Sequence, residues 1–412
     1  MSEWERLRQG LQPELYRGNA FRVTNLAVDA TLRDIDRQWK RLQMRQKLGS
    51  SAAEAAGLLP LTPPADLAAV REAVERLREP EKRFFDEFFW FWPAANDPAL
   101  PALARGDFSA ARTAWQTAAG PDAAGAVARH NLAVLMHVLA LDLECIAGEA
   151  QPTSSVRAEQ RDRCWAEALL AWKALLEQGE FWELVKERIR TRNEPQLKTD
   201  LAFHFREHLP VALLGINAQL ALRAAERGAA ADMARHKDIL SRAGFDTAAS
   251  TAVRLALKPI RARIQRLCQT EAGANQADNW RAGLLLFQRI LPIPLSVEQR
   301  ELLYEDVASA QRSLCWFCQR RFTDVGSEIR IWMHNHVVQK RVYGGSEVHW
   351  YQLIVDVPRC PKCYELHRVW DLRKMMGQLE PGVQPESEKL RYPEIERRLA
   401  EGWALGARPS GV

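Results

Sequence analysis

The sequence predicts a mainly α-helical protein with a small β module near its C-terminal end. Apolar residues recur at helical spacing over most of residues 20–313. Between Cys315 and Cys363 the period changes to the alternation of β-strands, and a Cys-x-x-Cys pair stands at each end of that stretch. The helical region and the cysteine-bounded β stretch together define the predicted fold class.

Length and composition are those of an ordinary globular protein with several domains. The chain has 412 residues, of which 47% are hydrophobic and 26% charged. A net charge of +5 is too small over this length to indicate a nucleic-acid partner by itself. We predict four parts: a helical module over 1–95, a repeat-like helical domain over 96–310, a metal-binding β module over 311–372 and a tail over 373–412.

Other features of the sequence indicate the cellular compartment of the protein. No run of eighteen apolar residues occurs, and the charged N-terminus lacks the apolar core of a secretory signal, so we expect no membrane span and a cytoplasmic protein. The seven cysteines are an odd number and four of them lie in metal-type spacing. This usage favours a reducing compartment over a disulfide framework.

The first predicted long helix follows Thr31, a suitable N-cap with Asp34 three residues later. Its buried stripe is expected to consist of Leu32, Ile35, Trp39 and Leu42. Its opposite face carries the basic side chains Arg33, Arg37, Lys40, Arg41, Arg45 and Lys47. A loop ending in Pro63-Pro64 separates this helix from the next one, which should begin near Asp66. The aromatic run that follows, Phe84 to Trp92, must be buried against other elements.

These residues resemble a J-domain, the module that partners DnaK-type chaperones. The resemblance is carried by Phe21-Arg-Val-Thr-Asn-Leu-Ala-Val-Asp-Ala-Thr31, by Ile35 and Leu42, and by Val70 to Arg83, and it covers about 70 residues. It implies a chaperone partner that binds the basic helix face. J-domains stimulate that chaperone through a His-Pro-Asp loop, and the loop here contains no histidine. The alternative is a plain helical hairpin whose charges form a solvated face.

The middle of the chain, from about Leu103 to Leu303, reads almost entirely as helix. Gly106 to Trp115, followed by Ala126 to Leu143, resembles one tetratricopeptide unit, and such helical repeats commonly offer a groove to another protein. The segment Leu209 to Leu222 is apolar almost all round, which predicts a buried helix.

No catalytic motif emerges from this region. Phosphate-loop, dinucleotide-binding and nucleophile-elbow patterns are absent from the sequence. His204 and His208 lie four residues apart and could face one metal, but they lack the Glu of a His-Glu-x-x-His motif, so we expect surface or capping histidines. We expect His130 and His137 to serve packing.

The strongest motif is Cys315-Trp-Phe-Cys318 with Cys360-Pro-Lys-Cys363. Four thiolates in two such pairs are the ligand set of a structural Zn²⁺ site. Residues 329–342 and 348–357 alternate and flank Gly344-Gly345, which predicts a β-hairpin that joins the two pairs and resembles a zinc ribbon. Four thiolates leave no open position for a substrate, so we expect a structural metal.

Two more specific interpretations compete with that of a purely structural zinc ribbon. His367 follows Cys363 by four residues, but the two cysteine pairs already fill a tetrahedron. The letters His334-Asn335-His336 also occur in the name of the HNH nucleases, yet consecutive residues of one strand point to opposite faces. We interpret both as coincidental neighbours.

The function predicted from these features is that of a non-enzymatic interaction protein, with other proteins as partners and a DnaK-type chaperone as one candidate. The alternative is nucleic-acid binding through the zinc module, since residues 312–374 hold eleven Lys or Arg against six acids. Aromatic side chains available to stack on bases are Trp316, Trp332, Tyr343, Trp350 and Trp370.

Overall fold

The structure, a computed structural model, describes residues 12–47, 57–94, 97–147, 155–269, 275–318, 323, 327–342, 345–375 and 392–406. Within these residues it contains 16 helices and three strands, so the predicted fold class is confirmed. The chain divides into two compact units, Met1–Ala256 and Leu257–Val412, with the boundary inside helix α13. The four-part division stays a prediction.

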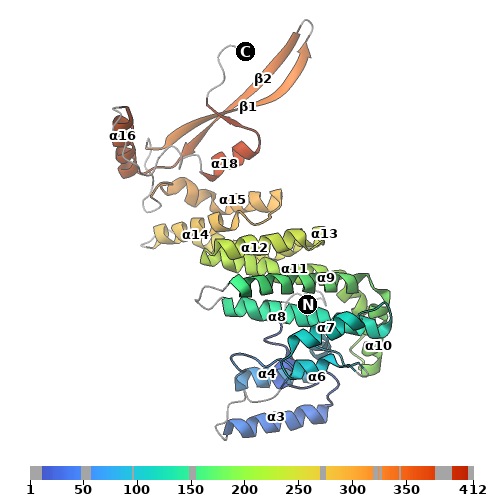
Figure 1. The fold of residues 1–412 in the computed structure, drawn as a ribbon. Helices are drawn as coiled ribbons and strands as arrows, with labels where there is room; N and C mark the ends of the chain where they lie inside the picture. The colour runs from blue at the N-terminus through green and yellow to red at the C-terminus, as the bar shows by residue number, and fades with distance from the viewer. Residues whose placement is uncertain are drawn as a thin grey trace. The chain divides into compact units, whose positions relative to one another are not determined.

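The first unit consists of helices throughout its described residues. In chain order they are α2 (Ala20–Thr24), α3 (Leu32–Lys47), α4 (Leu67–Arg78), α5 (Pro80–Phe88), α6 (Ala99–Ala104), α7 (Phe108–Ala118), α8 (Ala123–Ala147), α9 (Ser155–Glu177), α10 (Gly179–Arg192), α11 (Asp200–Arg227), α12 (Ala230–Arg242) and the start of α13 (Asp246–Cys268). Helix α8 packs along α9, and α11 packs along α12 (Figure 1).

The helix starts of the N-terminal region follow its polar residues. The Thr31 hydroxyl accepts a bond from the Asp34 N–H at 3.3 Å, and the Asp34 carboxylate accepts one from the Thr31 N–H at 3.0 Å. This reciprocal cap confirms the predicted start of α3. The Asp66 carboxylate caps α4 by accepting from the Ala69 N–H at 2.7 Å, again as predicted.

The predicted burial of the aromatic run is confirmed, and it forms the centre of the first unit. Phe88 is fully buried, and its ring lies 4.8 Å from that of Phe205 on α11 and 5.9 Å from that of Trp172 on α9. One hydrophobic core runs from Leu15 to Ile216 without interruption. The N-terminal helices and the helical body of this unit therefore share a core.

Helix α8 is the central helix of this core. Its stretch Ala123–Cys145 is long and apolar enough to cross a membrane, but 72% of an apolar 18-residue window within it is buried in the protein. The buried Asn131 on this helix is satisfied internally: it accepts from the Trp92 N–H at 2.8 Å and donates to the Trp92 carbonyl at 2.8 Å. This pairing is what a buried helix of a packed core requires.

The described residues of the second unit combine five helical segments with a small sheet. After the end of α13 come α14 (Gln276–Ile290), α15 (Val297–Ser313), β1 (Ile329–Val342), β2 (Gly345–Val357), α16 (Pro361–Met375), α18 (Pro393–Ala400) and β3 (Ala404–Leu405). The strands form an antiparallel sheet in the order β2-β1-β3. A bulge between His336 and Val338 interrupts the β1–β2 register.

Two elements of this unit differ from the predicted hairpin. Strand β3 adds a third strand by pairing with Met333 and His334 of β1. Helix α16 begins at Pro361, directly after the second cysteine pair begins. The core of the sheet is small and consists of Met333, Val355, Val357, Tyr392 and Ile395, against which Trp316 and Trp403 pack.

Candidate metal centre

The first cysteine pair lies at the end of helix α15. The helix ends at Ser313 with Leu314 as its C-cap, and Cys315 to Cys318 then form a tight turn in which Cys315 is fully buried. The Trp316 N–H donates to the Pro358 carbonyl at 2.8 Å, which ties this turn to the chain just before the second pair. The turn is therefore positioned by a backbone contact as well as by its sulfurs.

The second pair lies at the start of helix α16. Cys360 immediately precedes the helix and Cys363 lies in its first turn, where the Tyr364 N–H donates to the Cys360 carbonyl at 2.9 Å. The Cys363 N–H donates to the Cys360 sulfur. Unpaired N–H groups at a helix start favour negative charge, so this position suits a thiolate.

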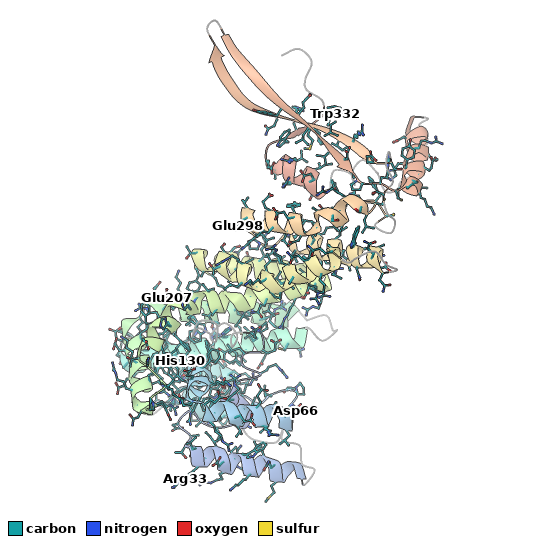
Figure 2. The ribbon with its side chains drawn as sticks, turned by 180° about the vertical axis from the view of Figure 1, so that it is seen from behind. Arg33, Asp66, His130, Glu207, Glu298 and Trp332 are labelled. Carbon is teal, nitrogen blue, oxygen red and sulfur yellow. The ribbon has the colours of Figure 1, made fainter. Side chains whose placement is uncertain are left out.

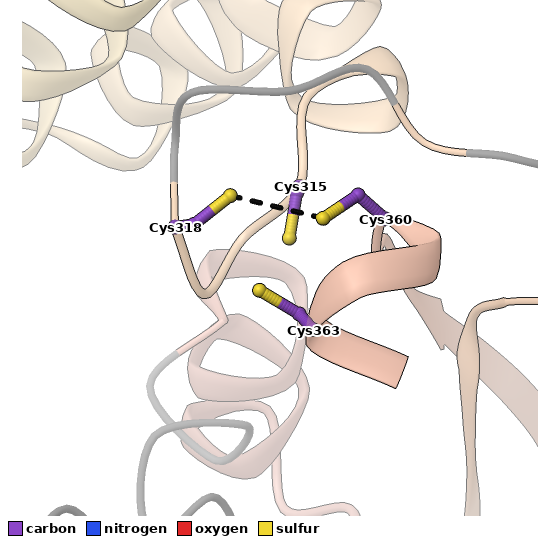
Figure 3. Close-up of side chains that lie close together, drawn as sticks. All are labelled: Cys315, Cys318, Cys360 and Cys363. Atoms are coloured by element: carbon purple, nitrogen blue, oxygen red, sulfur yellow. Dashed lines mark hydrogen bonds between the residues drawn. The ribbon is translucent and has the colours of Figure 1, made fainter. Parts of the chain in front are cut away.

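The four sulfurs converge on one point between the two turns, as Figure 3 shows. All four lie within 4.8 Å of one another, and the Cys318 and Cys360 sulfurs are 3.8 Å apart. A tetrahedron with Zn–S bonds of about 2.3 Å has edges of about 3.8 Å. All four thiols are free, with no disulfide among them. Their number, chemistry and spacing fit Zn²⁺, and together they form a candidate zinc site.

The thiols differ in how readily they lose a proton. Burial raises the pKa of the Cys315 and Cys363 thiols. Burial also opposes ionisation of Cys360, but the N–H of Cys363 and hydrogen bonds from the neighbouring thiols outweigh it and lower the pKa of Cys360. A bound dication would stabilise all four thiolates, and it would hold the turn after α15 and the start of α16 together.

Arg359 adds a cation beside the sulfurs. Its charge interacts with those of Cys315 and Cys363, while its Nε donates to the Ser327 carbonyl at 2.6 Å. One guanidinium nitrogen lies 3.3 Å from Nδ1 of His367. His367 lies against the Phe317 ring, at 4.4 Å between centroids, and is not part of the four-sulfur cluster. The sequence analysis did not identify Arg359 as part of the site. The one feature that could have indicated it is its position directly before Cys360.

Replacing Arg359 should weaken zinc binding. Zn²⁺ with four thiolates carries a net negative charge, and Arg359 both offsets it and fixes the chain before Cys360. We expect R359Q to lower zinc affinity by about tenfold or more, measured by competition with a chromophoric chelator. The control R368Q removes an exposed α16 cation whose partner is Glu365 at 3.3 Å. Equal affinities of R359Q, R368Q and the unmodified protein would contradict a role for Arg359.

The His334-Asn335-His336 letters lie as predicted at successive positions of strand β1, opposite Gln352, Tyr351 and Trp350. Nδ1 of His334 lies 3.1 Å from the Gly406 carbonyl, so this imidazole contacts the residue that follows strand β3. The side chain of His336 is outside the described residues. Within the described part of the chain, His334 does not belong to a group of side chains close enough together to hold a metal ion.

The buried histidines serve packing, as expected from the sequence. His130 stacks on Trp92 at 4.1 Å between ring centroids, and its Nε2 lies 2.8 Å from the Phe88 carbonyl. Nδ1 of His137 lies 3.2 Å from the Tyr16 hydroxyl. Burial lowers the pKa of His130 to about 4 and that of His137 to about 3, so both are neutral at pH 7.

A second group of donors lies in the first turns of α11. The predicted pair His204 and His208 is joined by Glu207, and the donor atoms of all three lie within 4.8 Å of one another. The sequence does lack a His-Glu-x-x-His motif, but a carboxylate accompanies these histidines at another position. The signal was present in the spacing His-x-x-Glu-His, which places three donors on one side of a helix.

The basic residues predicted to bind a partner lie on helix α3. Arg33, Arg37, Lys40 and Arg41 are exposed, and Figure 2 shows Arg33 on the outer side of the helix. Arg45 lies in the last turns of α3, with its side chain outside the described residues. The buried stripe predicted for this helix is present at Ile35 and Leu42, but Leu32 is 61% exposed.

No protein-family model, curated protein or solved structure matches this chain. The chain is a mainly helical protein with a four-cysteine cluster near its C-terminal end. Its function has to be inferred from the sites themselves.

Proposed function

We propose that this chain is a non-enzymatic, cytoplasmic interaction protein that binds an acidic surface of another protein through helix α3. In this proposal the Cys315–Cys363 centre holds a structural Zn²⁺, because four thiolates close its coordination shell. The observation that carries the proposal is the exposed basic face of α3, formed by Arg33, Arg37, Lys40 and Arg41.

The charges of this face are poorly compensated. Arg37 lies 3.4 Å from Asp34, with both side chains exposed. No ion pair involves Arg33, Lys40 or Arg41 within the part of the chain that the structure describes. Uncompensated cations on one helix face attract an acidic partner and accelerate its association.

Helix α3 also carries exposed apolar side chains that a partner could bury. Leu32 and Met44, near the two ends of α3, are 61% and 66% exposed. A surface hollow of about 410 Å³ lies between α3 and the chain before it, lined by Leu26, Ala27, Asp29, Ala30, Asp34, Arg37, Gln38 and Arg41. Apolar positions with a basic rim are typical of protein interfaces.

A DnaK-type chaperone is the partner we propose to test first. The J-domain resemblance of residues 21–31 and 70–83 supports this choice, as do the helices α2 to α5, in which α2 and α3 both pack on α4. The sequence lacks the His-Pro-Asp tripeptide after α3. The proposal is therefore binding without stimulation of the chaperone ATPase.

Reversing two charges of the face tests this proposal. We expect K40E/R41E to weaken binding to a purified DnaK-type chaperone at least tenfold, measured by biolayer interferometry at low and physiological salt. The matched control R190E/R242E reverses two exposed cations on α10 and α12 and should bind normally. If both double variants bind the chaperone equally well, the basic face of α3 is not the binding surface. If the protein stimulates the chaperone ATPase normally, the proposal of binding without stimulation is wrong.

Nucleic-acid binding by the zinc module is the second candidate. Trp332 is 47% exposed on β1, opposite Ile354 at 44%, and Figure 2 shows it on the hairpin. Trp316 instead packs against the sheet core, and the side chains of Tyr343, Trp350 and Trp370 lie outside the described residues. One exposed tryptophan beside Arg330 supports this candidate less strongly than four exposed cations support the first. If the zinc module binds nucleic acid, the affinity for nucleic acid should fall steeply as the salt concentration rises.

A further inference from the structure

Helix α11 carries a cluster of metal-type ligands in its first turns, apart from the cysteine centre. His204, Glu207 and His208 occupy positions i, i+3 and i+4, which lie on one side of a helix. Their donor atoms all lie within 4.8 Å of one another. Nε2 of His208 is 3.7 Å from a carboxylate oxygen of Glu207. Two imidazoles and a carboxylate form a ligand set that proteins use for Zn²⁺.

The two imidazoles lie close enough together to share an ion after side-chain rotation. The rings of His204 and His208 are nearly parallel, with an interplanar angle of 6° and centroids 6.5 Å apart. Bonds of about 2.0–2.1 Å need donors separated by roughly 2.9–3.4 Å. His204 and His208 are partly exposed and Glu207 is exposed, so their side chains have room to rotate toward one ion.

The core fixes which side of α11 faces outward. Phe205 is 5% exposed, and its ring contacts those of Phe84 and Phe88, while Leu209 one turn later is fully buried. With these residues facing inward, the donors lie to the side: the Glu207 side chain is 55% exposed and that of His208 is 27% exposed. Figure 2 shows Glu207 at the edge of the helical unit. An ion can therefore reach the cluster from solvent.

The neighbouring cation does not compete for this position. Arg206 directs its Nε to the Leu176 carbonyl at 3.0 Å, at the end of α9. The Arg206 guanidinium is thus held by another helix.

We propose that His204, Glu207 and His208 form a second metal site, which binds a borderline divalent transition ion of the class Zn²⁺, Ni²⁺ or Cu²⁺. Imidazole ligands favour this class over Mg²⁺ and Ca²⁺, whose preferred ligands are all oxygen. The ligand set differs from the four thiolates of the C-terminal centre. Three protein donors leave coordination positions open to water or to a further ligand.

Titration with Ni²⁺ tests this site on the full chain loaded with one equivalent of Zn²⁺, which fills the tighter four-thiolate centre and leaves the α11 cluster free of zinc. Isothermal titration calorimetry should detect one Ni²⁺ in addition to the bound zinc. We expect H204Q and H208Q each to weaken Ni²⁺ binding at least tenfold, and H204Q/H208Q to abolish it. E207Q should weaken it by a smaller factor. The control H334Q, which changes a partly exposed histidine of strand β1, should bind Ni²⁺ normally.

Absorption spectra identify which residues hold the Ni²⁺. Binding at α11 produces weak ligand-field bands without the intense thiolate-to-metal charge-transfer bands of a cysteine site. The proposal is refuted if the unmodified protein takes up no extra Ni²⁺, if H204Q/H208Q binds like the unmodified protein, or if all bound Ni²⁺ shows thiolate charge transfer. Circular dichroism of each variant confirms that α11 is intact.

Discussion

Removal of zinc is expected to unfold the C-terminal β module while the helices of the first unit stay folded. The sheet has a core of five buried residues, whereas the first unit has one continuous core from Leu15 to Ile216. In comparable zinc peptides metal binding supplies about 10–16 kcal/mol, which is the folding free energy of so small a module. Without the ion, three buried thiols lose their shared partner.

Hydrogen exchange read by mass spectrometry separates the two parts of the chain. After chelation, amides of β1 and β2 should lose protection, whereas amides of α8 and α11 should keep it. C363S should reproduce this pattern without a chelator, because it removes one ligand of the cluster. C145S changes a cysteine outside the cluster and should retain both zinc and protection. Full protection of β1 and β2 in protein that metal analysis shows to be free of zinc would refute the structural role.

The cysteine site was predictable from sequence because its information is local. Each Cys-x-x-Cys pair is complete within four residues, and the alternating stretch between the pairs indicates the hairpin that joins them. Helix α16 was not predicted because its apolar residues form no single buried stripe: Leu366 and Val369 are 59% and 46% exposed. Strand β3 was missed because two residues carry no periodicity.

Contacts between distant parts of the chain were less predictable. The interaction of Arg359 with two sulfurs depends on how the chain turns into α16, which no local pattern specifies. Glu207 was overlooked for a different reason: its spacing is local, but the motif considered places the carboxylate beside the first histidine instead of the second. A count of donors at i, i+3 and i+4 would have included it.

The aromatic run shows how far a local pattern leads. The density of rings from Phe84 to Trp92 predicts burial, and Phe88 is indeed fully buried. Two of its partners, Phe89 and Trp92, belong to the run, but the others come from four other helices, and their identity follows from packing. The rings in contact with Phe88 are those of Phe89, Trp92, His130, Trp172, Phe181, Trp182 and Phe205.

Truncating Phe88 should therefore destabilise the first unit more than most single substitutions. F88A removes the ring that these seven residues enclose and leaves a cavity that fixed helices cannot fill. We expect the free energy of unfolding of this unit to fall by about 3–5 kcal/mol, which corresponds to a Tm lower by roughly 6–20 °C. Urea unfolding of the zinc-loaded chain, followed by circular dichroism, measures the change.

The control uses a phenylalanine of the same unit that packs on the surface. Phe203 is 63% exposed, so F203A should change the free energy of unfolding by no more than about 0.5 kcal/mol. F88L retains most of the buried volume and should lie between the two, because the loss scales with the cavity that remains. If F88A unfolds at the same urea concentration as F203A, the ring of Phe88 is not enclosed as described, and the shared core of α5, α9, α10 and α11 would have to be abandoned.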